Sequence, residues 1–427
     1  MKKLPLYVRI ILGMIAGVLF ALLVTQFDGG ARFTKDWIKP FGNIFIKLLK
    51  LIAVPLVLAS LIKGVTDLKD ISRLSKMGLR TIVFYIATTV CAITLGLLLV
   101  NTFKPGKSIT ESTRTELIAA YSTDAGAKQE EAKKQQSAGP LQFLEDIVPD
   151  NIVGAASTNS LMLQVIFFAL FTGIAVILMP EKQTKPFKEF FDSFNDIILK
   201  MIDLIMLGAP YGVFALMAAL VTELPNAEIF IALAQYAGTV IGGLFILILG
   251  FYPLVIYLFT RRNPYRFLRQ ISPAQLLAFS TSSSAATLPV TMEMVETKVG
   301  VDNEVSSFVL PIGATINMDG TSLYQAVAAV FIAQAFGMNL DLSAQLGIVL
   351  TALLASIGTA AVPSAGIVML IIILTQAGIP EAGIALIFAV DRPLDMLRTT
   401  ANVTSDATIS TVIAKSIGKL ENPVLAK

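Results

Sequence analysis

Apolar residues run along the chain in stretches long enough to cross a membrane. Six of these runs occupy the first 260 residues: Leu4–Gln26, Ile38–Ile62, Ile82–Val100, Leu161–Met179, Ile197–Leu220 and Ile229–Phe259. A helix of about 20 apolar residues spans the roughly 30 Å of hydrocarbon in a bilayer. A helix also satisfies its own backbone hydrogen bonds in lipid. The pattern therefore predicts an all-α polytopic membrane protein.

Two later segments are apolar only at their ends. Ile271–Val295 holds five consecutive hydroxyl residues, Ser280–Ser284, and Leu346–Leu374 holds Ser356–Thr359 followed by Pro363. Such a small, polar centre is unfavourable for a helix in contact with lipid. It suits two half-helices that meet at a re-entrant tip, where exposed backbone faces a cavity. We expect two re-entrant hairpins here.

Each expected hairpin is followed by an apolar helix that carries strongly polar groups. Phe308–Phe336 contains Asn317 and Asp319, and Ala382–Ile413 contains several charged residues. Two hairpin-plus-helix units in the same order are typical of secondary transporters built from inverted repeats, with the binding site near the midplane. Together with the six runs, these helices predict eight transmembrane helices and two re-entrant hairpins.

The last helix carries a polar stripe. Asp395, Arg398, Asn402 and Asp406 are three or four residues apart and share one helix face. A charge at bilayer depth costs about 3 kcal/mol even on insertion scales, so the stripe needs pairing or a function. One interpretation is a structural ladder of ion pairs. The other is a binding site, with oxygens that suit a hard cation and an arginine that grips a carboxylate.

Composition supports a membrane protein and excludes several enzyme classes. The chain is 55% hydrophobic and 15% charged, with a mean hydropathy of +0.74. It has no histidine and one cysteine, Cys91. Serine–histidine and cysteine–histidine catalysis are therefore excluded, and we expect no enzyme. A serine hydrolase at Ser282–Ser284 would need a lysine base, and a channel lined by the hairpins is a further alternative.

Connections rich in Lys and Arg alternate along the chain with connections that are poor in them. Lys and Arg are frequent at the N-terminus and after the second, fourth and sixth runs, whereas Asp28–Asp36 and Thr222–Glu228 are poor in them. By the positive-inside rule, the N-terminus is cytoplasmic and the polar segment 104–140 is external. Its composition predicts a flexible connection.

Several strings place the chain in a known family. Ser283-Ser284 before Thr287-Leu288-Pro289, and the strings beginning at Asn317, Ala355 and Asp395, resemble those of the dicarboxylate/amino acid:cation symporters. The resemblance covers nearly the whole chain and suggests a prokaryotic member. It implies a homotrimer of elevator type in the plasma membrane, with both termini cytoplasmic and no nucleic-acid partner.

The family fold implies a division of the chain. Residues 1–75 and 141–225 would form a fixed scaffold of spans one, two, four and five. Residues 76–103 and 226–420 would form the mobile transport domain, with 104–140 as the flexible external connection.

The resemblance assigns a substrate site for an acidic amino acid. Arg398 would pair with the side-chain carboxylate, Asp395 would accept the ammonium group, and Asp391 would orient Arg398. The remaining expected contacts are Ser283, Ser284, Thr321, Val362, Gly366, Thr399 and Asn402. Dicarboxylate carriers and neutral amino acid exchangers are the competing substrate classes within the family.

The resemblance also implies three sodium sites made of side-chain and backbone oxygens. One comprises Gly313, Asn317, Asn402 and Asp406; the second comprises Tyr85, Thr88, Thr89, Asn317 and Asp319; the third comprises carbonyls of Thr315, Ser356, Ile357 and Thr359. The chain departs from the family pattern at Ser282, Ala361, Ser364, Arg392, Met396 and Ser405. We expect Arg392 to support Asp395, three residues away on the helix.

Overall fold

The computed structural model describes residues 6–67, 75–120, 148–157, 161–223, 227–358 and 365–421. Within these ranges the chain is helical, apart from an isolated antiparallel bridge between Val301 and Leu420. The all-α prediction is therefore confirmed for the described part of the chain.

The first half of the chain forms long helices joined by short elements. They are α1 (Leu6–Val24), α2 (Gly30–Phe33), the π-helix η1 (Thr34–Ile38), α3 (Lys39–Asp67), α4 (Ser75–Phe103), the 3-10 helix η3 (Pro105–Ser108), α5 (Glu111–Ala120), α8 (Ile152–Ala156), α9 (Met162–Leu178), α10 (Glu181–Leu207) and α11 (Ala209–Glu223).

The second half contains shorter, more often interrupted helices. They are α12 (Ala227–Ile246), the π-helix η5 (Leu247–Phe251), α13 (Tyr252–Thr260), α14 (Pro264–Thr281), α15 (Ser284–Met294), the π-helix η6 (Val295–Val299), α16 (Asn303–Ile316), α17 (Asp319–Ala335), α18 (Leu342–Gly358), α19 (Ala365–Gln376), the 3-10 helix η7 (Glu381–Gly383) and α20 (Ile384–Ser416).

Three helical stretches in the described ranges are long and apolar enough to cross a membrane: Gly30–Thr66, Met77–Ser108 and Glu228–Thr260. A fourth is formed if α10 and α11 make one span bent by 52°. The apolar run Ile197–Leu220 suggested one continuous helix, which is wrong at Gly208. Pro210 opens α11, where its missing N–H is tolerated because the first turn needs no intrahelical donor.

The expectation of one helix over Phe308–Phe336 is also wrong. The chain leaves the helix at Asn317, whose φ and ψ are −99° and 91°, and α17 starts at Asp319. In the segment expected as the first hairpin, α14 and α15 pack together across a short turn, and its re-entrant placement in a membrane stays a prediction. Ser282 takes the left-handed conformation in that turn, and the Ser283 hydroxyl caps α15 by accepting from the Ala286 N–H.

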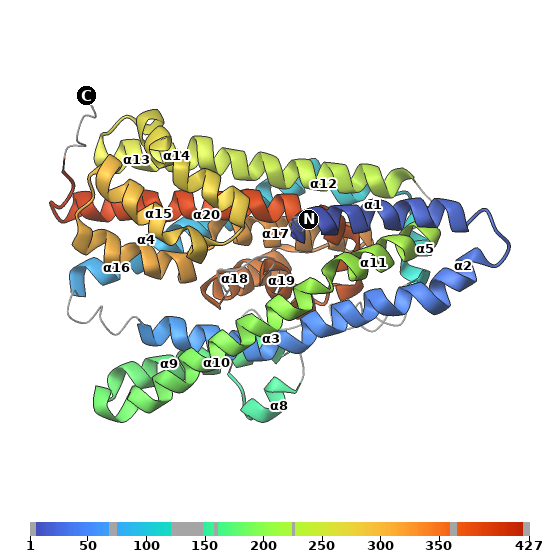
Figure 1. The fold of residues 1–427 in the computed structure, drawn as a ribbon, viewed down its shortest axis with the longest axis horizontal. Coiled ribbons are helices and arrows are strands. Elements are labelled where there is room, and N and C mark those ends of the chain that lie inside the picture. Colours follow the sequence, from blue (N-terminus) through green and yellow to red (C-terminus); the bar gives the residue numbers. More distant parts are fainter. Residues whose placement is uncertain are drawn as a thin grey trace, which may run out of the picture.

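The helices pack in two groups that meet around α18 and α19 (Figure 1). One group contains α1, α3, α9, α10 and α11; the other contains α4 and the helices from α12 to α17 with α20. Helices α18 and α19 contact both α3 and α9 of the first group and α17 of the second. The predicted division into scaffold and transport domain follows the same grouping and stays a prediction.

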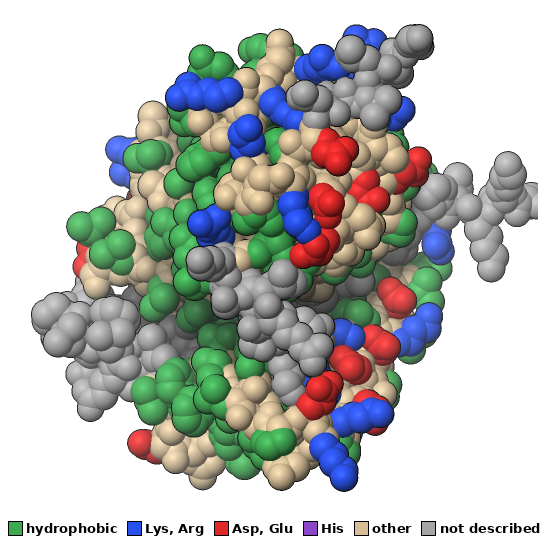
Figure 2. Space-filling view, turned by 90° about the vertical axis from the view of Figure 1, so that its left-hand side faces the viewer, with side chains coloured by type: hydrophobic (Ala, Val, Ile, Leu, Met, Phe, Trp, Pro, Cys, Tyr) green, Lys and Arg blue, Asp and Glu red, His purple; other side chains and the backbone are tan. Residues whose placement is uncertain are grey.

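The segment after α20 turns back and binds the start of α16. The Glu421 N–H donates to the Gly300 carbonyl at 2.8 Å, and the Asp302 N–H donates to the Lys419 carbonyl at 3.1 Å. Lys419 also pairs with Glu304, and this hydrogen bond raises the pKa of Lys419. Figure 2 views the molecule from this end and shows charged side chains of both signs there among hydrophobic ones.

The start of the segment expected as a flexible connection is helical. The Gly106 N–H donates to Gln334 on α17 at 3.1 Å, and Thr110, just before α5, donates its N–H to the Glu228 carboxylate at the same distance. Residues 121–140 lie outside the described part of the chain.

Candidate functional site

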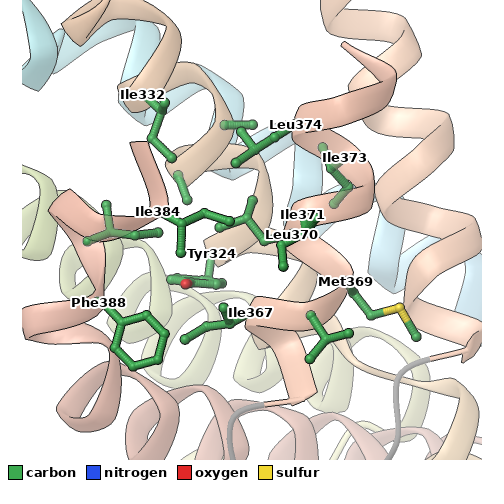
Figure 3. Close-up of a cluster of buried hydrophobic side chains, with 14 of the residues drawn as sticks. Tyr324, Ile332, Ile367, Met369, Leu370, Ile371, Ile373, Leu374, Ile384 and Phe388 are labelled. Atoms are coloured by element: carbon green, nitrogen blue, oxygen red, sulfur yellow. The ribbon is translucent and has the colours of Figure 1, made fainter. Parts of the chain in front are cut away.

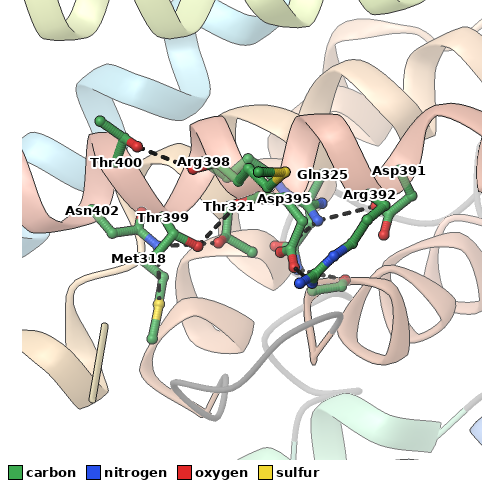
Figure 4. Close-up of polar contacts among 12 residues, drawn as sticks. Met318, Thr321, Gln325, Asp391, Arg392, Asp395, Arg398, Thr399, Thr400 and Asn402 are labelled. Atoms are coloured by element: carbon green, nitrogen blue, oxygen red, sulfur yellow. Dashed lines mark hydrogen bonds and ion pairs between the residues drawn. The ribbon is translucent and has the colours of Figure 1, made fainter. Parts of the chain in front are cut away.

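An ion-pair network lies at the middle of α20 (Figure 4). The Arg398 guanidinium is fully buried, and its Nη2 lies 3.0 Å from Asp391 Oδ1 and 2.8 Å from Asp395 Oδ1. Arg392 Nη1 lies 3.0 Å from Asp395 Oδ2. The predicted contact between Arg392 and Asp395 is therefore confirmed. With two arginines and two aspartates, the network is electrically balanced.

Arg398 keeps donors that this network does not use. Its Nε and Nη1 are buried and have no hydrogen-bond partner among the described residues. The guanidinium carbon lies 3.8 Å from the centre of the Tyr324 ring, which supports the arginine from α17. A Cβ atom added to Gly366 would lie 3.5 Å from Nη1, so the start of α19 runs beside the free donors. The structural ion-pair ladder thus exists, yet it leaves part of the arginine available for an acceptor.

Hydrophobic side chains fix the position of Tyr324. Residues of α17, α19 and the start of α20, among them Ile332, Ile367, Ile384 and Phe388, form one buried cluster around it (Figure 3). Such close-packed surroundings restrict the ring to one orientation. The support under Arg398 is therefore rigid.

The break between α16 and α17 is held by two other helices. Asn402 on α20 accepts the Gly320 N–H at 2.8 Å, and its amide donates to Thr321 Oγ1 at 3.3 Å. Ser356 on α18 accepts the Met318 N–H at 3.2 Å. These contacts satisfy backbone donors that a broken helix would otherwise leave unpaired in a buried position.

One group of oxygens surrounds Asn317. Its amide nitrogen donates to Asp406 Oδ1 at 2.8 Å, while its Oδ1 is buried without a partner among the described residues. A Cβ at Gly313 would lie 2.4 Å from the Tyr85 hydroxyl and 2.5 Å from Asp406 Oδ1, so only glycine fits there. An unpaired buried oxygen beside a carboxylate is the arrangement expected where a cation binds.

A second group of oxygens surrounds Asp319, which is fully buried at the start of α17. Its Oδ1 accepts from Thr89 at 2.7 Å and from Thr88 at 3.4 Å, both on α4. Its Oδ2 accepts from Ser405 at 2.7 Å and from Tyr252 at 3.0 Å. Of the residues predicted for this site, Thr88 and Thr89 contact Asp319, whereas the Tyr85 hydroxyl donates to the Val309 carbonyl and Asn317 bonds Asp406 and Ser405. Ser405 and Tyr252 add two hydroxyls that were not predicted for the site.

The remaining predicted residues are placed as follows. Ser283 and Ser284 are buried at the turn between α14 and α15, Thr399 is buried on α20 and donates to the Asp395 carbonyl at 2.9 Å, and Thr315 is exposed near the end of α16. Thr359, Val362, Ala361 and Ser364 lie outside the described residues, and Ile357 is described only as part of α18.

Ser405 and Tyr252 were not predicted as site residues, for different reasons. Ser405 lies three residues after Asn402 and seven after Arg398, so the polar stripe could have included it. Tyr252 lies inside an apolar run beside Pro253, and nothing in the pattern marks it. Its contact with Asp319 depends on how α13 packs against the other helices.

The two parts of the site suit different ligands. Carboxylate, amide and hydroxyl oxygens around Asn317 and Asp319 match the preference of hard cations such as sodium. The free Nη1 of Arg398 can donate a charge-assisted hydrogen bond to a carboxylate. Asp395, on the same helix turn, offers an acceptor for a positive group.

Comparison with known proteins places the chain among membrane symporters. The model of the family described as "Sodium:dicarboxylate symporter family" matches residues 6–416. The chain is 33% identical to the proton/sodium-glutamate symport protein of Bacillus caldotenax over 98% of the chain and 96% of the relative. It is 35% identical to the excitatory amino acid transporter 3 of Oryctolagus cuniculus, over 96% of the chain and 85% of the relative. It is 36% identical to the neutral amino acid transporter B(0) of the same species, over 93% of the chain and 77% of the relative.

Replacing Gly313 with alanine should weaken cation binding. The added methyl would overlap the Tyr85 hydroxyl and Asp406, and overpacking of this kind costs about 1–3 kcal/mol, so sodium affinity should fall about tenfold or more. Sodium-dependent thermal stabilisation of the purified protein measures this. Gly242→Ala on α12 is the control, because its Cβ meets nothing within 4 Å. Equal sodium affinities in the two variants would contradict the assignment.

Proposed function

The chain belongs to the sodium:dicarboxylate symporter family, and from this premise we propose that it is a secondary active transporter of acidic amino acids. It couples the entry of sodium to the uptake of aspartate, glutamate or both. The family and its relatives are transporters, so the chain is not an enzyme. The proposal draws on the names of the glutamate symporter and the excitatory amino acid transporter among the relatives.

The buried Arg398 is the observation that carries this proposal. A substrate carboxylate accepts from the unused Nη1 of Arg398, and the substrate ammonium group pairs with Asp395. Arg392 then keeps the Asp395 carboxylate in place from the other side. A neutral amino acid would leave the guanidinium donors unpaired, and a dicarboxylate without an amine would lack the group that pairs with Asp395.

Sodium is the second substrate, and its binding oxygens surround the α16–α17 break. Asn317, Asp406 and the Gly313 carbonyl supply one site, and Asp319 with Thr88 and Thr89 supplies another. The third site, at the second hairpin, forms when that hairpin closes over the substrate. Asn402 lies on α20 four residues after Arg398 and accepts the Gly320 N–H at the α17 N-terminus, so ion and substrate binding share one structural element.

The assembly is proposed from the family fold. Eight spans and two re-entrant hairpins form each protomer of a homotrimer in the plasma membrane, with both termini cytoplasmic. The helix group with α3 acts as the scaffold, and the group with α20 moves across the membrane as an elevator. Helices α18 and α19 lie at the junction of the two groups, where the second hairpin would act as the gate.

Uptake in proteoliposomes tests the proposed function. With an inward sodium gradient, radiolabelled aspartate or glutamate should accumulate, and malate, serine and alanine should not compete with the accumulated amino acid. Replacing sodium with choline while imposing a proton gradient should abolish uptake. Undiminished uptake in choline would overturn sodium coupling.

Arg398 should make the carrier specific for acidic substrates. A charge-assisted pair in a dehydrated site contributes roughly 2–5 kcal/mol, so Arg398→Thr should lower aspartate affinity by about two or more orders of magnitude. The variant should retain or gain sodium-dependent binding of serine or alanine. Arg392→Ala is the matched control and should alter affinity or turnover while keeping acidic selectivity. Intact sodium binding without binding of any neutral amino acid in Arg398→Thr would defeat the selectivity claim.

Protons should not be co-transported, although one group of relatives is named for protons as well as sodium. The chain has no histidine to carry a proton, and Gln325, a buried polar residue of α17, cannot titrate. Gln325 donates its amide to the Gly366 carbonyl at 3.1 Å. The external pH of weakly buffered proteoliposomes should stay constant when aspartate is added in the presence of sodium. Stoichiometric alkalinisation would contradict this expectation.

A further inference from the structure

The Asp319 carboxylate is surrounded by hydroxyl groups. It is fully buried, and no lysine or arginine of the described residues pairs with it. Its hydrogen-bond partners are four hydroxyls from three helices: Thr88 and Thr89 on α4, Tyr252 on α13 and Ser405 on α20. A buried carboxylate is stable in this surrounding only if these donors, or a bound cation, balance its charge.

The four donors divide between the two carboxylate oxygens. Both threonines from α4 contact Oδ1, and both Tyr252 and Ser405 contact Oδ2. A hydroxyl can turn to offer its lone pair to a cation instead of its proton. The threonine side is the side proposed for sodium. Tyr252 and Ser405 can then remain donors to Oδ2 while sodium binds at Oδ1.

Tyr252 reaches this carboxylate through an irregularity in its span. It is the first residue of α13 and directly follows the π-helix Leu247–Phe251. A π-turn inserts an extra residue and thereby rotates the side chains that follow it, and such turns are frequent at functional sites. The Tyr252 side chain is fully buried, with its hydroxyl 3.0 Å from Asp319 Oδ2.

Ser405 connects the two groups of oxygens. Its hydroxyl donates to Asp319 Oδ2 at 2.7 Å and accepts from the Asn317 amide at 2.9 Å. The same Asn317 nitrogen lies 2.8 Å from Asp406 Oδ1. A continuous path of hydrogen bonds therefore leads from Asp319 through Ser405 and Asn317 to Asp406.

We propose that Tyr252 and Ser405 are positioning residues of the sodium site at Asp319. They hold Oδ2, so that Oδ1 faces the Thr88 and Thr89 hydroxyls with its orientation fixed before the ion arrives. Ser405 also transmits the occupancy of this site to Asn317 and Asp406. This inference rests on the proposed sodium coupling and adds to it two residues that do not themselves bind the ion.

Single-atom substitutions test the proposal in the full-length reconstituted protein. Tyr252→Phe and Ser405→Ala each remove one hydroxyl and preserve the shape of the side chain. Tyr257→Phe, on the exposed face of α13, and Ser410→Ala, a buried serine of α20 without a partner among the described residues, are the matched controls. Thermal stability of all four variants is measured without sodium, so that a fold effect is seen separately.

Loss of a charge-assisted hydrogen bond should raise the half-saturating sodium concentration about tenfold in Tyr252→Phe and in Ser405→Ala. Maximal uptake at saturating sodium and aspartate should remain close to that of the wild type, and the two controls should behave as the wild type. Ser405→Ala should also lower the Hill coefficient for sodium, whereas Tyr252→Phe should leave it unchanged.

Two results would overturn the proposal. Unchanged sodium dependence in both variants, with or without a loss of thermal stability, would reduce the two hydroxyls to a structural role. An unchanged Hill coefficient in Ser405→Ala would remove the link between the sites. Failure of the proposed function is a separate outcome, because wild-type vesicles would then lack sodium-dependent uptake. In that case, direct measurement of sodium binding to the purified variants still tests the roles of Tyr252 and Ser405. A wild-type protein that binds no sodium would also overturn the proposal.

Discussion

Ionised groups buried in an apolar helix bundle are the constraint on which the rest of this structure depends. Arg398 and Asp319 are fully enclosed, and neither could stay charged there without compensation. The structure compensates them in two ways. Arg398 is balanced by Asp391 and Asp395, whereas Asp319 is balanced by neutral hydroxyls. The first arrangement leaves donors for an anion, and the second leaves a net negative charge for a cation.

Two irregular segments lie beside these charges. The α16–α17 break and the π-helix before Tyr252 depart from regular α-helix next to Asp319. In contrast, α20 is a continuous helix of 33 residues, about 50 Å long, although it contains Pro393. The regular helix sets the spacing of the charged residues, and the irregular segments bring backbone and side-chain oxygens to meet them.

The sequence predicted the elements with strong periodic or compositional signals. The polar stripe of α20 gave Asp395, Arg398, Asn402 and Asp406, and the five hydroxyl residues ending at Ser284 marked the turn between α14 and α15. The break at Gly208 was missed because apolar residues continue on both sides of it. The break at Asn317 was missed although Asn317, Asp319, Thr321 and Ser322 interrupt the apolar run there. The Tyr85, Thr88 and Thr89 cluster required the family resemblance, since alone it resembles ordinary packing. Tyr252 was out of reach, because only the packing of α13 against α17 and α20 gives its hydroxyl a partner.

The way the α16–α17 break is fastened has a thermodynamic consequence. Asn402 on α20 and Ser356 on α18 hold Gly320 and Met318, which flank Asp319 in the same break, next to the oxygens around Asn317. Any ligand that favours one geometry of this break shifts the binding equilibria of the other ligands that contact it. Linkage is reciprocal, so the factor by which sodium tightens substrate binding equals the factor by which substrate tightens sodium binding. The coupling free energy that the α16–α17 break carries therefore sets how much sodium can cross without substrate, and how much substrate can cross without sodium.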